Sequence, residues 1–371
     1  MPQWLLKSIG LIISAIALFS TKAAGRFAFY LFARAPGAKP ESDKEALLLR
    51  EAAPRIAKAK VLRLLLPDGS VVAAYDFGVR QPEQCRGKVL VVHGYRSRTE
   101  HMLPIIEAMR GHDFQVVAID MPGHGRSLAR RSHLINAGEA IDAAWRQFDG
   151  FDVFVGHSFG SAAIISVAAG MISGVPARRP YKLVTIASPT RLKTIFDWFA
   201  SETGMSAAVR EAFEGEVFTL SGRRLEEFDA AEGMGRIRCE ALVMHAPDDK
   251  EVPFSNAEKL AAAGPHVRLL SVPGYGHRRI LSAPPVIEGI LDFLGVRDFS
   301  NFEGIGHSGR VQRQRCEGED RKAVDRAFEQ TRCGTNLKPI PCQANPSSQT
   351  LILTRVKIEP EMPIGWRIAH S

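Results

Sequence analysis

Six short apolar runs, separated by longer segments, recur through the first 300 residues of this chain. Each run is rich in Val, Ile and Leu, as are strands that are buried on both faces of a sheet. The runs are KVLVVHG (88–94), FQVVAID (114–120), FDVFVGH (151–157), YKLVTIAS (181–188), CEALVMHA (239–246) and VRLLSVPG (267–274). Strands of this kind need helices on both sides of the sheet, so the pattern predicts an α/β structure.

The segments around these runs complete the pattern. KVLRLLL (60–66) and VVAAYDFG (71–78) flank the turn signal PDGS, which predicts an antiparallel hairpin. TEHMLPIIEAMRG (99–111) and PPVIEGILDFLG (284–295) have helical spacing. We therefore predict one mostly parallel, eight-stranded sheet with helices on both faces.

Residues 190–236 interrupt the alternation after the sixth predicted strand. The stretch is helical in pattern and carries aromatic residues of an exposed type, namely Phe196, Trp198 and Phe199. It follows the C-terminal end of a strand, where open parallel sheets bind their ligands. We predict a helical lid whose apolar inner face shapes a pocket; a pair of connecting helices is the alternative.

Residues 1–35 form an apolar N-terminal segment. Its uncharged run, Ser8–Ser20, is shorter than the roughly 20 residues of a transmembrane helix. The basic residues that follow it favour a cytoplasmic location for the rest of the chain; they are Lys22, Arg26, Arg34 and Lys39. We predict a membrane-associating segment. A signal peptide of an exported protein, or a helix packed on the domain, are the alternatives.

The remaining chain divides by composition. Residues 36–298 are predicted to form the globular domain, and residues 299–371 a polar, aperiodic tail of the kind that is disordered. In this tail only TLILTRVKI (350–358) is a candidate strand. The formal net charge is +8, but no basic stripe on a recognisable reading element accompanies it, so no nucleic-acid partner is expected.

The cysteines do not support a disulfide framework. Their number is odd, their spacing is wide and no CxxC pair is present, which predicts free thiols and no zinc site. They are Cys85, Cys239, Cys316, Cys333 and Cys342.

A single serine lies where a strand run meets a helix run of small residues. Gly156-His157-Ser158-Phe159-Gly160 matches the G-x-S-x-G nucleophile elbow, in which a sharp turn exposes the serine oxygen. The backbone N–H of Phe159 would then point to the place where a negative oxygen forms. A glycine-rich turn with a solvated serine is the alternative.

A serine hydroxyl needs a general base, and the base needs an orienting carboxylate. In chain order the acid and then the histidine are expected after the elbow. Asp249 follows the seventh predicted strand and His277 follows the eighth, at the same sheet edge as Ser158. Asp248 is the second choice of acid. His266 precedes the eighth strand and His307 lies in the tail, so both are poor rivals.

These motifs resemble the α/β-hydrolase superfamily over roughly residues 60–297. The resemblance favours Asp249 as the acid, because a Val-Pro pair follows it at the family's spacing, and His277 as the base. It implies that the backbone N–H of Tyr95, after His93-Gly94, is the second oxyanion donor. His124, in the loop AIDMPGHGRS, would have a structural role, as would His157. The resemblance implies no metal and no cofactor.

The predicted function is therefore that of a serine hydrolase, which cleaves a carboxylic ester or thioester through an acyl-enzyme. Small-molecule esters, including acyl-chain or lipid substrates, are the expected partners, because the predicted lid and the N-terminal segment are apolar. The alternatives are an acyltransferase or a peptidase with the same triad, or a non-catalytic binding member of the fold. The sequence does not determine an oligomeric state.

Overall fold

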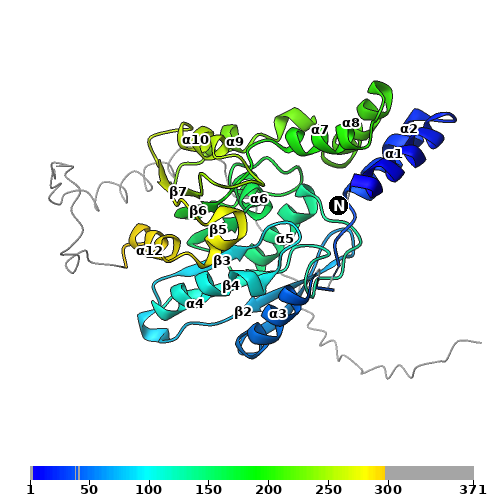
Figure 1. Ribbon diagram of the computed structural model, residues 1–371. Helices are drawn as coiled ribbons and strands as arrows, with labels where there is room; N and C mark the ends of the chain where they lie inside the picture. The colour runs from blue at the N-terminus through cyan, green and yellow to red at the C-terminus, as the bar shows by residue number, and fades with distance from the viewer. Residues whose placement is uncertain (1–2, 38, 41, 297–371) are drawn as a thin grey trace, which may run out of the picture. The chain divides into compact units, whose positions relative to one another are not determined.

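The computed structural model describes residues 3–37, 39–40 and 42–296, and at its centre lies one eight-stranded sheet (Figure 1). The predicted tail, with Cys316, Cys333, Cys342 and the candidate strand 350–358, lies outside the described residues. The strands are β1 (Lys60–Leu65), β2 (Val71–Asp76), β3 (Lys88–Val92), β4 (Gln115–Ile119), β5 (Val153–His157), β6 (Lys182–Ile186), β7 (Glu240–His245) and β8 (Val267–Ser271).

The sheet has the order β1-β2-β4-β3-β5-β6-β7-β8. β1 pairs with β2, and β2 with β4, in antiparallel fashion, whereas the other pairs are parallel. Val92 pairs with Gly156, and His157 with Ile186, so the carboxyl ends of β3, β5 and β6 meet at one edge. The predicted fold class is confirmed.

The central strands are buried on both faces, as their apolar runs predicted. In β5, Phe154 faces one apolar cluster, whereas Val153 and Val155 face the other. The first cluster is covered by α5 (Leu134–Gln147), α6 (Phe159–Ala168) and α10 (Ser255–Ala261). The second is covered by α3 (Asp43–Ile56), α4 (Leu103–Gly111) and α12 (Pro284–Phe293). Short helices η1 (Pro82–Gln84), η2 (Thr99–Met102), α11 (Gly276–Arg279) and η4 (Ile280–Ser282) lie in the connections.

The insertion after β6 is helical, as its pattern predicted. It consists of α7 (Leu192–Glu202), α8 (Ala207–Ser221), η3 (Leu225–Glu227) and α9 (Ala230–Arg236). Ser206 caps α8 by accepting the N–H of Val209, and Asp229 caps α9 by accepting the N–H of Ala231. These caps satisfy backbone donors that the helix itself leaves without acceptors.

The N-terminal segment forms two helices, α1 (Gln3–Ala17) and α2 (Thr21–Phe32), with Ser20 as the N-cap of α2. This helical hairpin lies against α7 and α8 (Figure 1). Two glycines permit the close approach: a Cβ on Gly10 would clash with the carbonyl oxygen of Thr203, and one on Gly25 with Ala212. Among the described residues, no helix combines the length and apolarity needed to cross a bilayer.

The hairpin corrects one sequence expectation. Phe196 and Phe199, expected to be exposed, are buried, and only Trp198 remains half exposed. The reason is that Phe29 and Phe32 of α2 pack on these rings, with centroid separations of 6.3 Å for Phe29–Phe196, 4.6 Å for Phe32–Phe196 and 5.3 Å for Phe32–Phe199. Aromatic pairs at such distances are favourable beyond the area that they bury.

Candidate active site

Ser158 occupies a strained turn between β5 and α6. Its backbone has φ 52° and ψ −121°, a conformation that residues with a Cβ rarely adopt. The turn is held on both sides: the N–H of Ser158 donates to the carbonyl of Ile186 at 2.8 Å, and the carbonyl of Ser158 accepts from the N–H of Ser161 at 2.9 Å. The surrounding structure thus maintains a conformation that an isolated turn would not.

The two glycines of the elbow allow α6 to cross close to the sheet. A Cβ on Gly160 would lie 2.4 Å from the carbonyl oxygens of Val92 and His93. A Cβ on Gly156 would lie 2.7 Å from the Cα of Ser161. Real Cβ atoms do not approach backbone so closely, so any larger residue would displace the serine.

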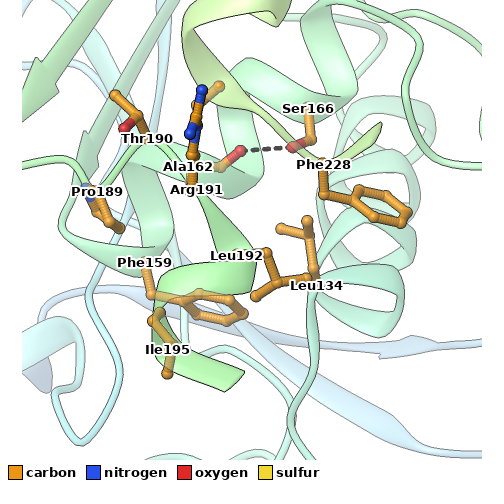
Figure 2. A pocket seen from close by; sticks show the side chains of 11 residues that line it. Leu134, Phe159, Ala162, Ser166, Pro189, Thr190, Arg191, Leu192, Ile195 and Phe228 are labelled. Carbon is orange, nitrogen blue, oxygen red and sulfur yellow. Dashed lines mark hydrogen bonds between the residues drawn. The ribbon is translucent and has the colours of Figure 1, made fainter. Parts of the chain in front are cut away.

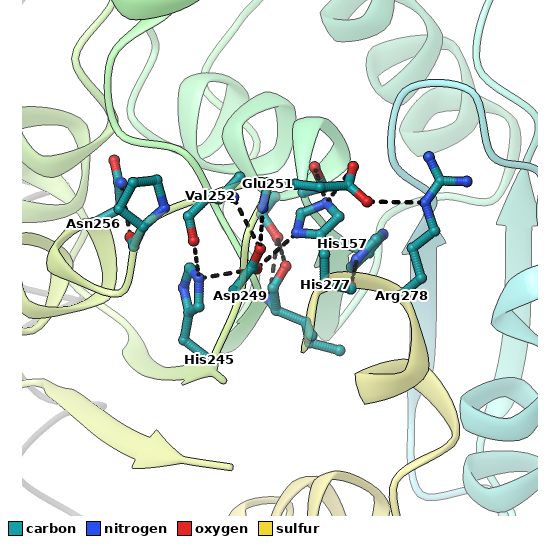
Figure 3. A network of polar contacts seen from close by, with 12 residues as sticks. His157, His245, Asp249, Glu251, Val252, Asn256, His277 and Arg278 are labelled. Carbon is teal, nitrogen blue, oxygen red and sulfur yellow. Dashed lines mark hydrogen bonds and ion pairs between the residues drawn. The ribbon is translucent and has the colours of Figure 1, made fainter. Parts of the chain in front are cut away.

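Ser158, His277 and Asp249 form one chain of hydrogen bonds (Figure 3 labels the histidine and the aspartate). Nε2 of His277 lies 3.0 Å from Oγ of Ser158, and Nδ1 of His277 lies 2.8 Å from Oδ2 of Asp249. Because a carboxylate only accepts, the proton belongs on Nδ1 and the lone pair of Nε2 faces the serine hydroxyl. The structure brings these three sequence-predicted residues together.

The alternative acid, Asp248, points elsewhere. Its Oδ1 accepts the N–H of Gly274 at 2.7 Å, which ties the loop after β7 to the loop after β8. Asp249 instead is buried, and its Oδ1 accepts the N–H groups of Glu251 and Val252 at 2.8 and 2.9 Å. Burial alone would raise the pKa of Asp249, but hydrogen bonds from His245 and His277 hold it well below its usual range.

His245 is a neighbour of Asp249 that the sequence motifs did not indicate. Its Nε2 lies 3.2 Å from Oδ2 of Asp249 and 2.9 Å from the carbonyl oxygen of Val252 (Figure 3). Both neighbours are acceptors, so the proton belongs on Nε2 and is shared between them. The signal in the sequence was the spacing: His245 ends β7, four residues before Asp249.

His157 supports the histidine of the site rather than the serine. Its Nε2 lies 2.9 Å from the carbonyl oxygen of His277, and the two rings are 4.9 Å apart. Burial, followed by the neighbouring His277, lowers the pKa of His157 to about 3. His157 is therefore neutral over the physiological range and donates one fixed hydrogen bond.

The turn after β3 lies directly beside Ser158. A Cβ on Gly94 would be 2.9 Å from Nδ1 of His157 and 3.0 Å from the Cβ of Ser158, so a larger residue would push on both side chains. His93 fixes the turn: its Nε2 accepts the N–H of Met121 at 2.9 Å, and its Nδ1 lies 2.7 Å from the carbonyl oxygen of Gly94. Burial lowers the pKa of His93 well below its usual value, which keeps this acceptor neutral.

Tyr95 follows Gly94 in this turn and Phe159 follows Ser158; both are predicted oxyanion donors. Their rings meet edge to face, with centroids 6.3 Å apart. Nε2 of His124 accepts the N–H of Arg96 at 3.0 Å, and its Nδ1 lies 3.0 Å from the carbonyl of Pro122. These contacts with backbone agree with the structural role expected for His124.

His266 was the other candidate base within the described residues. His266 lies away from the serine, with Nε2 3.2 Å from the carbonyl oxygen of Met234, and His307 lies outside the described residues. Within residues 3–37, 39–40 and 42–296, no group of three or more His, Cys, Asp or Glu side chains is arranged to hold a metal ion. Cys85 and Cys239 are free thiols.

An apolar pocket begins at Phe159, one residue from the serine (Figure 2). Its enclosed space is about 20 Å³, and the rest of it is open to solvent. Its walls come from α5, α6, the loop after β6, α7 and the segment around α9; apolar lining residues include Leu134, Phe159, Leu192, Ile195 and Phe228. The hydroxyls of Ser166 and Thr190 already donate to Ala162 and Asn256. The pocket therefore suits an apolar group.

Known proteins are similar to this chain over most of the predicted globular domain. The family model for the alpha/beta hydrolase family matches residues 89–288. "Putative carbamate hydrolase RutD" of Caulobacter sp. (strain K31) is 24% identical over 265 residues, which cover 62% of this chain and 98% of that protein.

Two solved structures are similar to this chain at low sequence identity. The Pyrococcus furiosus esterase Pf2001 is 17% identical, with 71% of this chain and 98% of that chain covered and a TM-score of 0.50. The esterase domain of a Rhodothermus marinus protein is 21% identical, with 64% and 96% covered and a TM-score of 0.46. The match to the family model extends from β3 to α12 and includes the whole Ser158–His277–Asp249 chain, and on this ground the protein belongs to the alpha/beta hydrolase family.

Proposed function

We propose that this protein is a serine hydrolase that cleaves a carboxylic ester or thioester with an apolar acyl group. The observation that carries the proposal is the 3.0 Å contact between Ser158 Oγ and His277 Nε2, continued to Asp249 at 2.8 Å. A hydroxyl becomes a useful nucleophile only beside a base that is oriented in this way.

In the proposed reaction, Oγ of Ser158 attacks the acyl carbon while its proton passes to Nε2 of His277. Asp249 stabilises the resulting imidazolium, and the N–H groups of Tyr95 and Phe159 bind the oxyanion, each such donor contributing about 3–4 kcal/mol. The intermediate collapses to an acyl-serine, and His277 gives its proton to the departing alcohol or thiol. Water, deprotonated by His277, then releases the carboxylic acid and restores the serine.

The pocket supports an acyl chain as the group that is recognised. It starts at Phe159, beside the proposed nucleophile, and the polar side chains at its wall are paired within the protein: Nε of Arg191 donates to Asp229 at 2.9 Å. Burial of each methylene contributes about 0.8 kcal/mol, so activity should rise with chain length until the pocket is full. In this proposal α7 and its neighbours act as the lid predicted from residues 190–236.

The test combines labelling with a substrate panel. A fluorophosphonate should label the wild-type protein at Ser158, and Ser158→Ala should abolish both labelling and ester hydrolysis while the far-ultraviolet dichroism is unchanged. Activity on p-nitrophenyl esters of increasing length but not on aminoacyl anilides separates an esterase from a peptidase. Ester hydrolysis in the presence of an added alcohol separates an esterase from an acyltransferase. Labelling at another serine, or no labelling at all, would refute the proposed mechanism.

A further inference from the structure

The helical hairpin α1–α2 presents an apolar surface that nothing in the described part of the chain covers. Five side chains form it, and we call them the apolar ridge: Trp4, Leu11, Ile12, Leu18 and Phe19. Their exposed fractions are 69%, 74%, 50%, 85% and 93%. Single exposed apolar residues are ordinary, but five in one short hairpin indicate an interaction site.

Trp4, Leu11 and Ile12 lie on the exposed side of α1, and Leu18 and Phe19 lie in the turn between α1 and α2. Leu6, Gly10 and Ile13 on the opposite face are buried. The hairpin is anchored to α7 and α8 by the aromatic contacts of Phe29 and Phe32. A helix that is apolar all round is normally enclosed by protein or lipid. α1 is enclosed on one side only.

The charges of the hairpin itself have one sign, and Arg26 of α2 lies 4.0 Å from Glu216 of α8. Residues 1–40 contain no Asp or Glu. Lys7 lies three residues after Trp4 and four before Leu11, on the same helix face, and Lys22 follows Phe19 at the tip of the hairpin. Both lysines are exposed. A second copy of the ridge would bring like charges together, whereas an anionic lipid surface would attract them.

We propose that the α1–α2 hairpin docks this protein on the surface of an anionic lipid bilayer, with the apolar ridge in the interface and Lys7 and Lys22 at the headgroups. α1 has 15 residues, so it lies along the surface and does not cross it. The hairpin packs on α7, and Leu192 and Ile195 of α7 line the apolar pocket, so docking brings the pocket wall close to lipid. The docking itself does not depend on the proposed catalytic role of Ser158.

The experiment measures binding of the full chain to sedimented vesicles of phosphatidylcholine, with and without phosphatidylglycerol, at low and high salt. Wild-type protein should bind the anionic vesicles, and high salt should weaken the binding. Leu18→Asp/Phe19→Asp should weaken it by more than about tenfold, because two apolar anchors are lost. Leu128→Asp, at a residue that is 68% exposed outside the hairpin, is the matched control and should bind as wild type does.

A second variant tests the charges without touching the apolar residues. Lys7→Gln/Lys22→Gln should lose about fivefold per lysine on anionic vesicles and nothing on neutral ones. Ser158→Ala should bind vesicles as wild type does, which separates this proposal from the catalytic one. The proposal is wrong if wild-type protein stays in the supernatant, if the ridge and lysine variants bind undiminished, or if the ridge variant only converts a dimer to a monomer.

Discussion

Nε2 of His245 lies 3.2 Å from Oδ2 of Asp249, the same carboxylate oxygen that faces His277. Two imidazoles, one from β7 and one from α11, therefore contact the same buried carboxylate. A carboxylate that accepts several hydrogen bonds remains ionised and keeps its orientation. This arrangement makes His245 a positioning residue, which acts on His277 through Asp249.

Removal of the His245 N–H should impair turnover more than substrate binding. His245→Leu should lower kcat about tenfold to a hundredfold with little change in KM, since a hydrogen bond to a charged group contributes about 1.5–3 kcal/mol. His245→Gln, whose amide N–H can take the place of Nε2, should retain most of the activity. Steady-state kinetics on one ester decide the matter: equal losses in both variants would indicate a packing role only.

The strained backbone of Ser158 predicts a gain in stability when the residue becomes glycine. At φ 52° a Cβ is unfavourable, and relief of such strain is worth about 1–3 kcal/mol, partly offset by the greater freedom of an unfolded glycine. Ser158→Gly should have a free energy of unfolding about 1 kcal/mol higher than that of Ser158→Ala, and should therefore unfold at a higher urea concentration, although both variants are inactive. Coincident urea curves would show that the turn is not strained.

The low pKa of His157 predicts a pH-dependent stability. Its folded pKa of about 3 lies below the ordinary value, so the unfolded chain binds a proton first and stability falls as the pH drops from about 6.5 towards 3. At pH 5 this contribution amounts to about 2 kcal/mol. His157→Gln keeps a donor for the carbonyl of His277 but does not titrate.

Urea unfolding of wild type and His157→Gln at several pH values measures this contribution. The difference in unfolding free energy between the two proteins should change by about 2 kcal/mol from pH 7 to pH 5. Other histidines with lowered pKa values, such as His93 and His133, titrate equally in both proteins and cancel in the difference. A difference that is independent of pH would contradict the burial of His157 as a neutral ring.

The low pKa of Asp249 predicts a second change in stability, at a lower pH than the change that His157 causes. A depressed carboxyl pKa contributes stability above the unfolded value of about 3.9, and this is lost as the pH falls below it. Asp249→Asn should be less stable than wild type at pH 7, and the gap should narrow as the pH falls from about 5 to 3. A constant gap in unfolding free energy would indicate that the carboxylate is not preferentially ionised in the folded protein.

The pocket predicts how chain-length preference can be changed. Ala162→Leu, on the pocket wall of α6, should lower kcat/KM for long-chain p-nitrophenyl esters by about tenfold to a hundredfold and leave acetate nearly unchanged, because overfilling costs about 1–3 kcal/mol. Ala208→Leu, at an exposed alanine of α8 outside the pocket, is the control. A uniform loss on all esters would place the acyl group elsewhere.

Local patterns in the sequence predicted most of the scaffold. Each run of Val, Ile and Leu became a strand, because a strand buried on both faces can be recognised from its own residues, although β8 is an exposed edge strand. The elbow could also be predicted, because its two glycines and the small residues of α6 are adjacent in sequence. The order of acid and histidine after the elbow indicated the loops from which Asp249 and His277 come.

Contacts between distant segments could not be predicted in this way. Asp248 and Asp249 are neighbours in one loop, and only the fold directs the first to Gly274 and the second to His277. Phe196 and Phe199 were expected to be exposed from their local sequence. The helix α2, more than 160 residues earlier in the chain, covers them. The sequence by itself determined the strands, the elbow and the family. Tertiary packing decided which side chains face one another, because side-chain direction depends on contacts between segments that local periodicity does not encode.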